Sequence, residues 1–152
     1  MNIRLLILVI AVIIVIGLVM SMSRGSVEYT STIKPEGTLR ISGTAITFEI
    51  ADTDEERIRG LSGRPSLRTG HGLLFIFPEE GNHGIWMKDM KFPIDIIWAD
   101  REGIIVTIAR NVSPDTYPQS FYPSKPARYV LELPAGTVDE RGILEGMTLQ
   151  RE

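Results

Sequence analysis

The chain of 152 residues contains no cysteine and only two histidines. The lack of cysteine excludes disulfide bonds, thiol catalysis, cysteine-ligated zinc and lipid attachment at a thiol. His71 and His83 lie twelve positions apart, whereas two zinc-binding histidines on one helix are separated by about four. We therefore expect neither a metal site nor a cofactor.

The chain also lacks a strong charge of either sign. Its formal net charge is -3, and acidic and basic residues are mixed along it, so the sequence offers no basic surface for nucleic acid. Motifs for a phosphate-binding loop, a nucleophile elbow or a metal-binding helix are absent as well. We expect no nucleic-acid partner, and no motif assigns an activity.

A long apolar run is present at the N-terminus. Residues 5–20 carry no charge, and residues 3–22 are interrupted only by Arg4 and Ser21. About 20 helical residues match the roughly 30 Å hydrocarbon core of a bilayer. We expect a transmembrane helix over residues 3–22, so a membrane is a predicted partner.

A cleaved signal peptide is the alternative for this segment, because Ser21-Met22-Ser23 resembles the small-x-small cleavage pattern. Arg4 and the amino terminus favour an N-inside orientation. We expect the following domain outside the cytoplasm, anchored to the membrane or, after cleavage, exported. The expected organisation is an anchor or uncleaved signal at residues 1–23, a flexible tether at 24–38 and one domain at 39–152.

Hydrophobic periodicity in the domain predicts mainly β-strands. Residues 39–41 and 46–50 alternate apolar and polar side chains on either side of residues 42–44. This alternation is typical of a β-hairpin. Further strands are predicted at residues 72–77, where Pro78 follows, and at 85–87, 94–99, 104–109, 127–133 and 147–149.

Two short helices complete the predicted domain. Thr53 and Glu56 have the spacing of a capping box, which predicts a helix ending at Gly60 or Gly63. A second helix is predicted at residues 135–141. The fold class we expect is α+β: a single β-rich domain of about seven mostly antiparallel strands, curled into a partial barrel with two short helices and preceded by the transmembrane helix.

Several separated blocks of the domain share their order and spacing with a known family. The blocks are residues 49–53 (EIADT), 59–61 (RGL), 72–75 (GLLF), 86–88 (WMK), 93–96 (PIDI) and 127–136 (ARYVLELPAG). The pattern resembles the family catalogued as domain of unknown function 192, which is found widely in bacteria and archaea and often behind an export signal. The resemblance covers residues 39–149. It implies a small β-rich α+β domain and no assigned activity.

Two arginines are the first candidates for ligand binding. Arg57 and Arg64 stand in the pattern Arg-x-x-Gly-Leu-x-x-Arg at the end of the first predicted helix. Two guanidinium groups in this arrangement suit a carboxylate or a phosphate. The structural alternative is that Arg57 binds Asp95 or Asp52 within the domain and that Arg64 caps a loop carbonyl.

An aromatic residue and two charges follow one another at the end of a short predicted strand. Alternation places Trp86 and Lys88 on one face and Met87 and Asp89 on the other. An aromatic platform beside a charge suits a sugar or another flat polar ligand. The structural alternative is that Trp86 packs in the core while Lys88 is solvated.

Asp95 lies in the apolar run at residues 94–99. A buried carboxylate must be paired or have a raised pKa, which makes Asp95 a candidate site residue. Paired with Asp89, it would be suited to glycoside hydrolysis. The structural alternative is a salt bridge with Arg57 or Lys88.

The segment at residues 111–126 contains four prolines together with Tyr117, Phe121 and Tyr122. Such a long irregular segment is often functional. It is interpreted either as a flap or docking site for another chain, or as a strap that covers the apolar face of the sheet.

Together these features favour a non-catalytic, membrane-tethered domain outside the cytoplasm that binds a small polar or carbohydrate-like ligand or an envelope protein. The alternative is an envelope-polymer hydrolase that uses Asp95 and Asp89. The expected ligand-binding residues are Arg57, Arg64, Trp86, Lys88 and Asp95.

Overall fold

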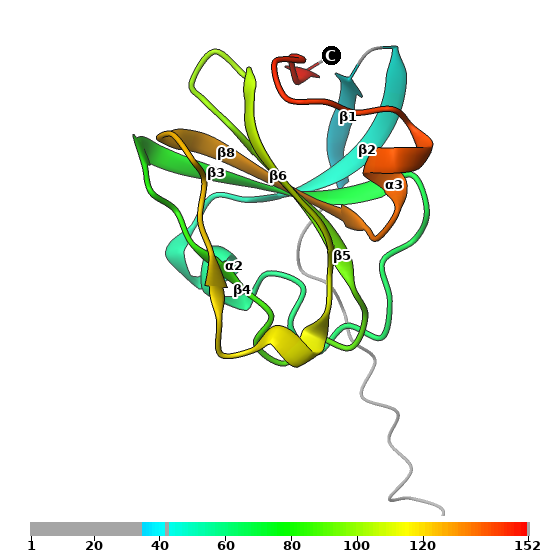
Figure 1. Ribbon diagram of the computed structural model, residues 1–152, viewed down its shortest axis with the longest axis vertical. Helices are drawn as coiled ribbons and strands as arrows, with labels where there is room; N and C mark the ends of the chain where they lie inside the picture. The colour runs from blue at the N-terminus through cyan, green and yellow to red at the C-terminus, as the bar shows by residue number, and fades with distance from the viewer. Residues whose placement is uncertain (1–34, 42, 152) are drawn as a thin grey trace, which may run out of the picture. The chain divides into compact units, whose positions relative to one another are not determined.

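The computed structural model describes residues 35–41 and 43–151 (Figure 1). The transmembrane helix expected at residues 3–22 and most of the expected tether lie outside the described residues. Within these two ranges, no helix combines the length and the apolar character needed to cross a bilayer. The described residues form the β-rich domain.

Seven strands form one curled, half-barrel sheet: β1 (Pro35–Ile41), β2 (Thr44–Ala51), β3 (His71–Gly81), β5 (Ile94–Ala99), β6 (Ile105–Val112), β8 (Ala127–Pro134) and β9 (Gln150–Arg151). Their order is β6-β5-β8-β3-β2-β1-β9. Neighbouring strands are antiparallel except for β2 and β3, which run parallel. The prediction of a β-rich α+β domain with a curled sheet and two short helices is confirmed.

The buried apolar side chains divide into two cores, one on each face of the sheet. Successive residues of a strand point to opposite faces, so Phe75 and Val130 belong to one core, whereas Leu74 and Leu131 belong to the other. We call these two sides the Phe75 face and the Leu74 face. Each face must pack against other segments, because apolar side chains that stay exposed to water gain no free energy from burial.

Different segments cover the two faces. Leu61 and Met87, from the segments that follow α2 (Asp54–Arg59) and β4 (Ile85–Trp86), pack on the Phe75 face. Val138 and Ile143, from α3 (Thr137–Glu140) and the segment behind it, pack on the Leu74 face. Figure 1 shows α2 and β4 together at one end of the sheet and α3 beside β1 and β2 at the other.

The helix α2 begins at the predicted capping box. The Thr53 hydroxyl accepts a hydrogen bond from the Glu56 amide at 3.2 Å, and a Glu56 carboxylate oxygen accepts one from the Thr53 amide at 3.2 Å. The bond from the Thr53 backbone lowers the pKa of Glu56. The helix ends at Gly60, the first of the two predicted positions, where φ is 48°.

Two predicted boundaries are wrong. A strand was expected at residues 147–149, but the Met147 carbonyl accepts a bond from Ile105 of β6, and the Leu149 amide donates one to Gly103 in the turn between β5 and β6. Only an isolated bridge forms there, between Thr148 and Ile104, and β9 forms at residues 150–151. The strand expected at residues 72–77 continues past Pro78 to Gly81. Its register with β8 skips from Ile76 to Gly81, so Pro78 lies where no ladder bond requires its missing N–H group.

The second helix is shorter than predicted. It was expected at residues 135–141, but α3 begins only at Thr137 because Gly136 adopts φ 87°, in the left-handed region.

The segment at residues 111–126 folds back against β4. Its strand β7 (Ser120–Phe121) pairs with β4 in a small second sheet, and it also contains the short helix η1 (Pro114–Thr116). Phe121 packs against the core on the Phe75 face, as the strap interpretation requires. Tyr117 and Tyr122 remain exposed.

Candidate functional site

A row of four residues crosses the Phe75 face of the sheet. Glu49 of β2 is in register with Leu73 of β3, Leu73 with Glu132 of β8, and Glu132 with Ile96 of β5. Two carboxyl groups therefore lie two strands apart, about 10 Å at the usual strand spacing. Both stand on an apolar face, where a charge needs a partner.

Arg64 supplies a partner for the first of these carboxyl groups. The residue lies in the loop behind α2, and only 6% of its surface is exposed. Its two terminal nitrogens donate to the two carboxylate oxygens of Glu49, each at 2.9 Å. This paired geometry is the strongest form of a guanidinium–carboxylate contact.

Among the described residues, the carboxyl group of Glu132 has no paired contact of this kind with a guanidinium group. The residue is 4% exposed, and its Oε2 atom forms no hydrogen bond with any residue that the structure describes. Burial raises the pKa of Glu132 to about 8, although the charge of Arg64 acts in the opposite direction. The side chain is therefore mostly protonated at neutral pH, and a protonated carboxyl group can donate a hydrogen bond.

Glu132 lines a small cavity of about 50 Å³, which we call the Glu132 pocket. Phe75 contributes to the lining from β3, Gly60 and Leu61 from the end of α2, and Trp86 from β4. A Cβ atom on Gly60 would approach the Phe75 ring to 3.3 Å, so the glycine allows both the tight turn and the close approach. The cavity has room for a water molecule or one small polar group.

Exposed aromatic side chains gather near this pocket. Trp86 is 47% exposed and Tyr117 is 46% exposed. Their rings meet edge to face with centroids 6.0 Å apart. The ammonium group of Lys88 lies 5.6 Å from the Trp86 ring, a favourable cation–π distance. The expected placement of Trp86 and Lys88 on one face agrees with this contact, and Met87 between them is buried.

Arg57 lines the pocket but is held mainly by its own surroundings. It donates to the Asp52 carbonyl, to the Ile76 carbonyl at 2.9 Å and to the Asp54 carboxylate at 2.5 Å. Its guanidinium also lies 5.4 Å from the centre of the Phe77 ring. These contacts fix α2 against β3, so Arg57 positions the wall of the pocket.

Asp95 lies away from the pocket. Its neighbours Ile94 and Ile96 point to the Phe75 face, so its own side chain points to the Leu74 face. Its two oxygens accept hydrogen bonds from the backbone amides of Asn111, at 2.8 Å, and Val138, at 2.9 Å. The carboxyl group is fully buried and joins β5, β6 and α3.

The expected partners of Asp95 are not beside it. Within residues 35–41 and 43–151, Asp95 forms no ion pair with Arg57 or Lys88. Asp89 is exposed and adopts φ 56°, and its carbonyl accepts a bond from Gly63 at 2.9 Å. The structure therefore brings Arg57, Arg64, Trp86 and Lys88 to one end of the Phe75 face but not Asp95.

Glu49 and Glu132 are the site residues that sequence reasoning missed. The signal for Glu132 was the one used for Asp95, a single carboxyl group within an apolar strand, since Glu132 lies between Leu131 and Leu133. The sequence does not show the order of the strands in the sheet, in which β8 lies between β3 and β5. Among the described residues, no group of three or more His, Asp or Glu side chains could hold a metal ion.

The fold and the sequence blocks define a class of small half-barrel domains. The model of the DUF192 family, described as an uncharacterized ACR, matches residues 37–151. The chain belongs to this family.

Curated relatives carry the name UPF0127 protein. One from Thermococcus sibiricus is 36% identical over 94 residues, which cover 60% of this chain and 56% of the relative. Another from Thermococcus gammatolerans is 34% identical over 102 residues, covering 64% of this chain and 61% of the relative. The chain thus spans less than two thirds of the length of these relatives.

Two crystal structures are similar to the domain. A Sinorhizobium meliloti protein with a proposed role in transcription regulation has a TM-score of 0.72 and 32% identity, covering 78% of this chain and 96% of that one. A protein of unknown function from Novosphingobium aromaticivorans has a TM-score of 0.74 and 25% identity, covering 82% of this chain and 91% of that one.

Proposed function

We propose that the domain is a recognition domain that binds a small polar or carbohydrate-like ligand at the Glu132 pocket. The observation that carries this proposal is the Oε2 atom of Glu132, which is buried, has no hydrogen-bond partner among the described residues and belongs to a side chain lining a cavity. A buried polar atom without a partner costs about 1 to 3 kcal/mol. A ligand that supplies the missing bond would recover that free energy.

The surroundings of the pocket favour a carbohydrate. Trp86 presents about half of its surface to solvent beside the cavity, and an aromatic face of this kind packs against the C–H surface of a sugar ring. The cavity of about 50 Å³ accepts a substituent and excludes a whole ring. The ring would rest on Trp86 while one hydroxyl or amide group reaches Glu132.

The location of this activity is part of the proposal. Residues 3–22 would hold the domain at the outer surface of a membrane, where envelope glycans are available. Regulation of transcription, the role proposed for the Sinorhizobium protein, has little support in this chain because its net charge of -3 offers no attraction to DNA.

A second candidate function is hydrolysis of an envelope polymer. The raised pKa of Glu132 is what a general acid requires at neutral pH. The expected pair of Asp95 and Asp89 lacks support, because both oxygens of Asp95 accept backbone hydrogen bonds on the other face. Glu49 is held by Arg64, which leaves Glu132 without an unoccupied second carboxylate in its row.

A panel of envelope glycans tests the proposal. The full chain in lipid nanodiscs is heated with each glycan, and the melting temperature of the domain is recorded. We expect at least one glycan to raise it for the wild type, and both Trp86→Ala and Glu132→Ala to remove most of that rise. Leu144→Ala, which truncates an exposed apolar side chain outside the pocket, is the matched control and should keep it.

The outcomes separate the candidates. A wild-type melting temperature that no glycan changes would refute the carbohydrate proposal. Release of shorter fragments from a glycan by the wild type but not by Glu132→Gln would favour the hydrolase.

A further inference from the structure

A larger cavity lies on the Leu74 face of the sheet. Its volume is about 360 Å³, within the range of about 300 to 1,000 Å³ typical of small-molecule sites. The Glu132 pocket involves Phe75 and Glu132, whereas this cavity involves Leu74 and Tyr129. Alternation along β3 and β8 therefore places the two cavities on opposite faces.

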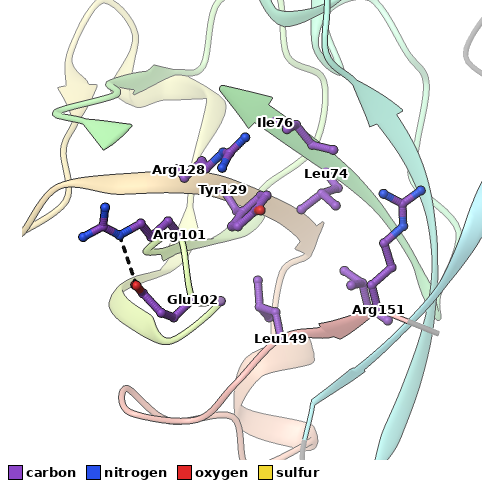
Figure 2. A pocket seen from close by; sticks show the side chains of 10 residues that line it. Leu74, Ile76, Arg101, Glu102, Arg128, Tyr129, Leu149 and Arg151 are labelled. Atoms are coloured by element: carbon purple, nitrogen blue, oxygen red, sulfur yellow. Dashed lines mark hydrogen bonds and ion pairs between the residues drawn. The ribbon is translucent and has the colours of Figure 1, made fainter. Parts of the chain in front are cut away.

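The floor of this cavity is apolar. Leu39 and Leu74 are almost fully buried members of the core, and Ile76, Tyr129 and Leu149 pack against that core while remaining partly exposed. Figure 2 shows Leu74, Ile76 and Leu149 between Arg128 on one side and Arg151 on the other. The concave surface thus offers apolar contact to a ligand.

Three arginines and one carboxylate line the same cavity, which we call the arginine pocket. Arg101 bonds to Glu102 at 3.0 Å and lies 3.6 Å from Glu80, so its charge is largely balanced. Arg128 and Arg151 form no ion pair within residues 35–41 and 43–151. These two positive charges beside an apolar floor complement a ligand that has an anionic head and an apolar body.

Within residues 35–41 and 43–151, both cations have contacts that hold them in place and neither has an ion-pair partner. Arg128 donates through Nε to the Phe77 carbonyl at 3.3 Å, and its guanidinium lies 5.9 Å from the Tyr129 ring. Arg151 belongs to β9, which pairs with β1, and its guanidinium lies 5.8 Å from the Phe48 ring. Contacts with a carbonyl and with aromatic rings orient a guanidinium but leave its charge available to an anion.

The wall formed by the β5–β6 turn is also ordered. The Gly103 amide bonds to the Asp100 carbonyl at 3.0 Å, and the Leu149 amide bonds to the Gly103 carbonyl at 2.8 Å. Because the wall and the rim are already fixed, binding would order few groups, which favours affinity.

We propose that the arginine pocket binds an organic anion with a short aliphatic body, of the class of medium-chain carboxylates. The aliphatic chain lies on Leu39, Leu74 and Leu149, and the carboxylate binds at the rim of the cavity, where Arg128 and Arg151 supply positive charge from opposite sides. This site is independent of the Glu132 pocket and of the function proposed for it.

Calorimetric titration of the full chain in lipid nanodiscs with octanoate tests this proposal, and empty nanodiscs give the background of partitioning into lipid. We expect saturable binding of one octanoate per chain. The double variant Arg128→Gln/Arg151→Gln should bind at least about tenfold more weakly, since it removes the positive charges that attract the carboxylate. Arg141→Gln, at an exposed arginine outside the cavity, is the matched control and should bind as the wild type does.

Two further ligands measure separately what the carboxylate and the aliphatic chain of octanoate contribute to binding. Octan-1-ol has the tail without the charge, and acetate has the charge without the tail, so we expect each to bind at least about tenfold more weakly than octanoate. No saturable octanoate binding, equal binding to the double variant, or equal binding of octanol would each overturn the proposal. Glu132→Gln should leave octanoate affinity unchanged, so the two sites can fail separately.

Methyl NMR spectra show where the ligand lies and whether the variants fold. Octanoate should shift the methyl resonances of Leu39, Leu74 and Leu149 and leave those of Leu61, on the other face, in place. Native dispersion in the spectrum of the double variant would show that its weaker binding is not a loss of structure. Shifts confined to residues outside the cavity would contradict the proposed location.

Discussion

At the scale of single residues, burial changes the pKa of Glu132 strongly. Its pKa in the folded protein is about 8, compared with an ordinary value of 4.5. Between these two values the folded chain keeps a proton that the unfolded chain releases. The free energy of unfolding therefore falls as the pH rises from about 4.5 to about 8 and changes little from this cause above that range.

Replacement of Glu132 by glutamine should remove this dependence, because the amide is neutral at every pH. We expect Glu132→Gln to be more stable than the wild type at pH 8, by an amount on the order of a few kcal/mol, and much closer to it at pH 4. Chemical denaturation across this pH range measures the difference.

Glu140→Gln, at an exposed glutamate of α3, is the control for the loss of one carboxylate. Parallel pH profiles for the wild type and Glu132→Gln would contradict the raised pKa.

Asp95 and Glu132 show what the sequence can say about a buried carboxyl group. Each lies in an apolar strand, and the expectation that Asp95 is buried is confirmed. Its partners are backbone amides of Asn111 and Val138, which are 16 and 43 residues away in the chain. Such partners depend on how the strands associate, so the sequence identified the group but not what satisfies it.

At the scale of elements, α2 is the short helix that forms one wall of the Glu132 pocket. A helix of six residues has little stability of its own, so its capping box and the contacts of Arg57 must hold it. Thr53→Ala removes the hydroxyl that accepts the Glu56 amide bond. We expect a loss of about 1 kcal/mol in the free energy of unfolding, measured by chemical denaturation.

Thr69→Ala provides the matched control, because Thr69 is exposed and lies in a loop. An equal loss in both variants would show that the capping box contributes nothing specific.

A second prediction at this scale concerns Gly72 of β3, which packs tightly against β8. A Cβ atom there would stand 2.9 Å from methyl groups of both Leu131 and Leu133 and 3.0 Å from the Glu132 carbonyl. We expect Gly72→Ala to lower the free energy of unfolding by about 1 to 3 kcal/mol through overpacking. Gly81→Ala, in the same strand, would have the His83 ring as its nearest neighbour, at 3.2 Å, and should cost less. A neutral Gly72→Ala variant would refute the close packing of β3 on β8.

The elements themselves were largely predictable from the sequence. The capping box at Thr53 and the alternation at residues 46–50 are local signals, and both gave the right element. The errors lie where distant contacts decide, as at residues 147–149, whose backbone bonds go to the β5–β6 turn and the first residue of β6. Periodicity reports which side chains are buried and does not report which strand lies beside which.

At the scale of the whole domain, the sheet separates two sites of different character. The Phe75 face carries a small polar pocket beside an exposed aromatic group, and the Leu74 face carries a larger apolar pocket beside arginines. Neither site could be predicted as a unit. Glu132 and Arg64 come together only because β8 lies between β3 and β5, and Arg128 and Arg151 line one cavity only because β9 joins the edge of the sheet.

The protonation state of Glu132 is the most direct test of the central claim, that this residue is an unpaired hydrogen-bond donor in a ligand pocket. The measurement is the ¹³C chemical shift of its carboxyl carbon between pH 4 and pH 10, in the full chain alone and with the glycan that raises the melting temperature most. We expect a midpoint of about 8 in the free protein and a higher midpoint with the glycan, since a bond donated by the neutral acid favours that form. A midpoint near 4.5, or one that the glycan leaves unchanged, would contradict the claim.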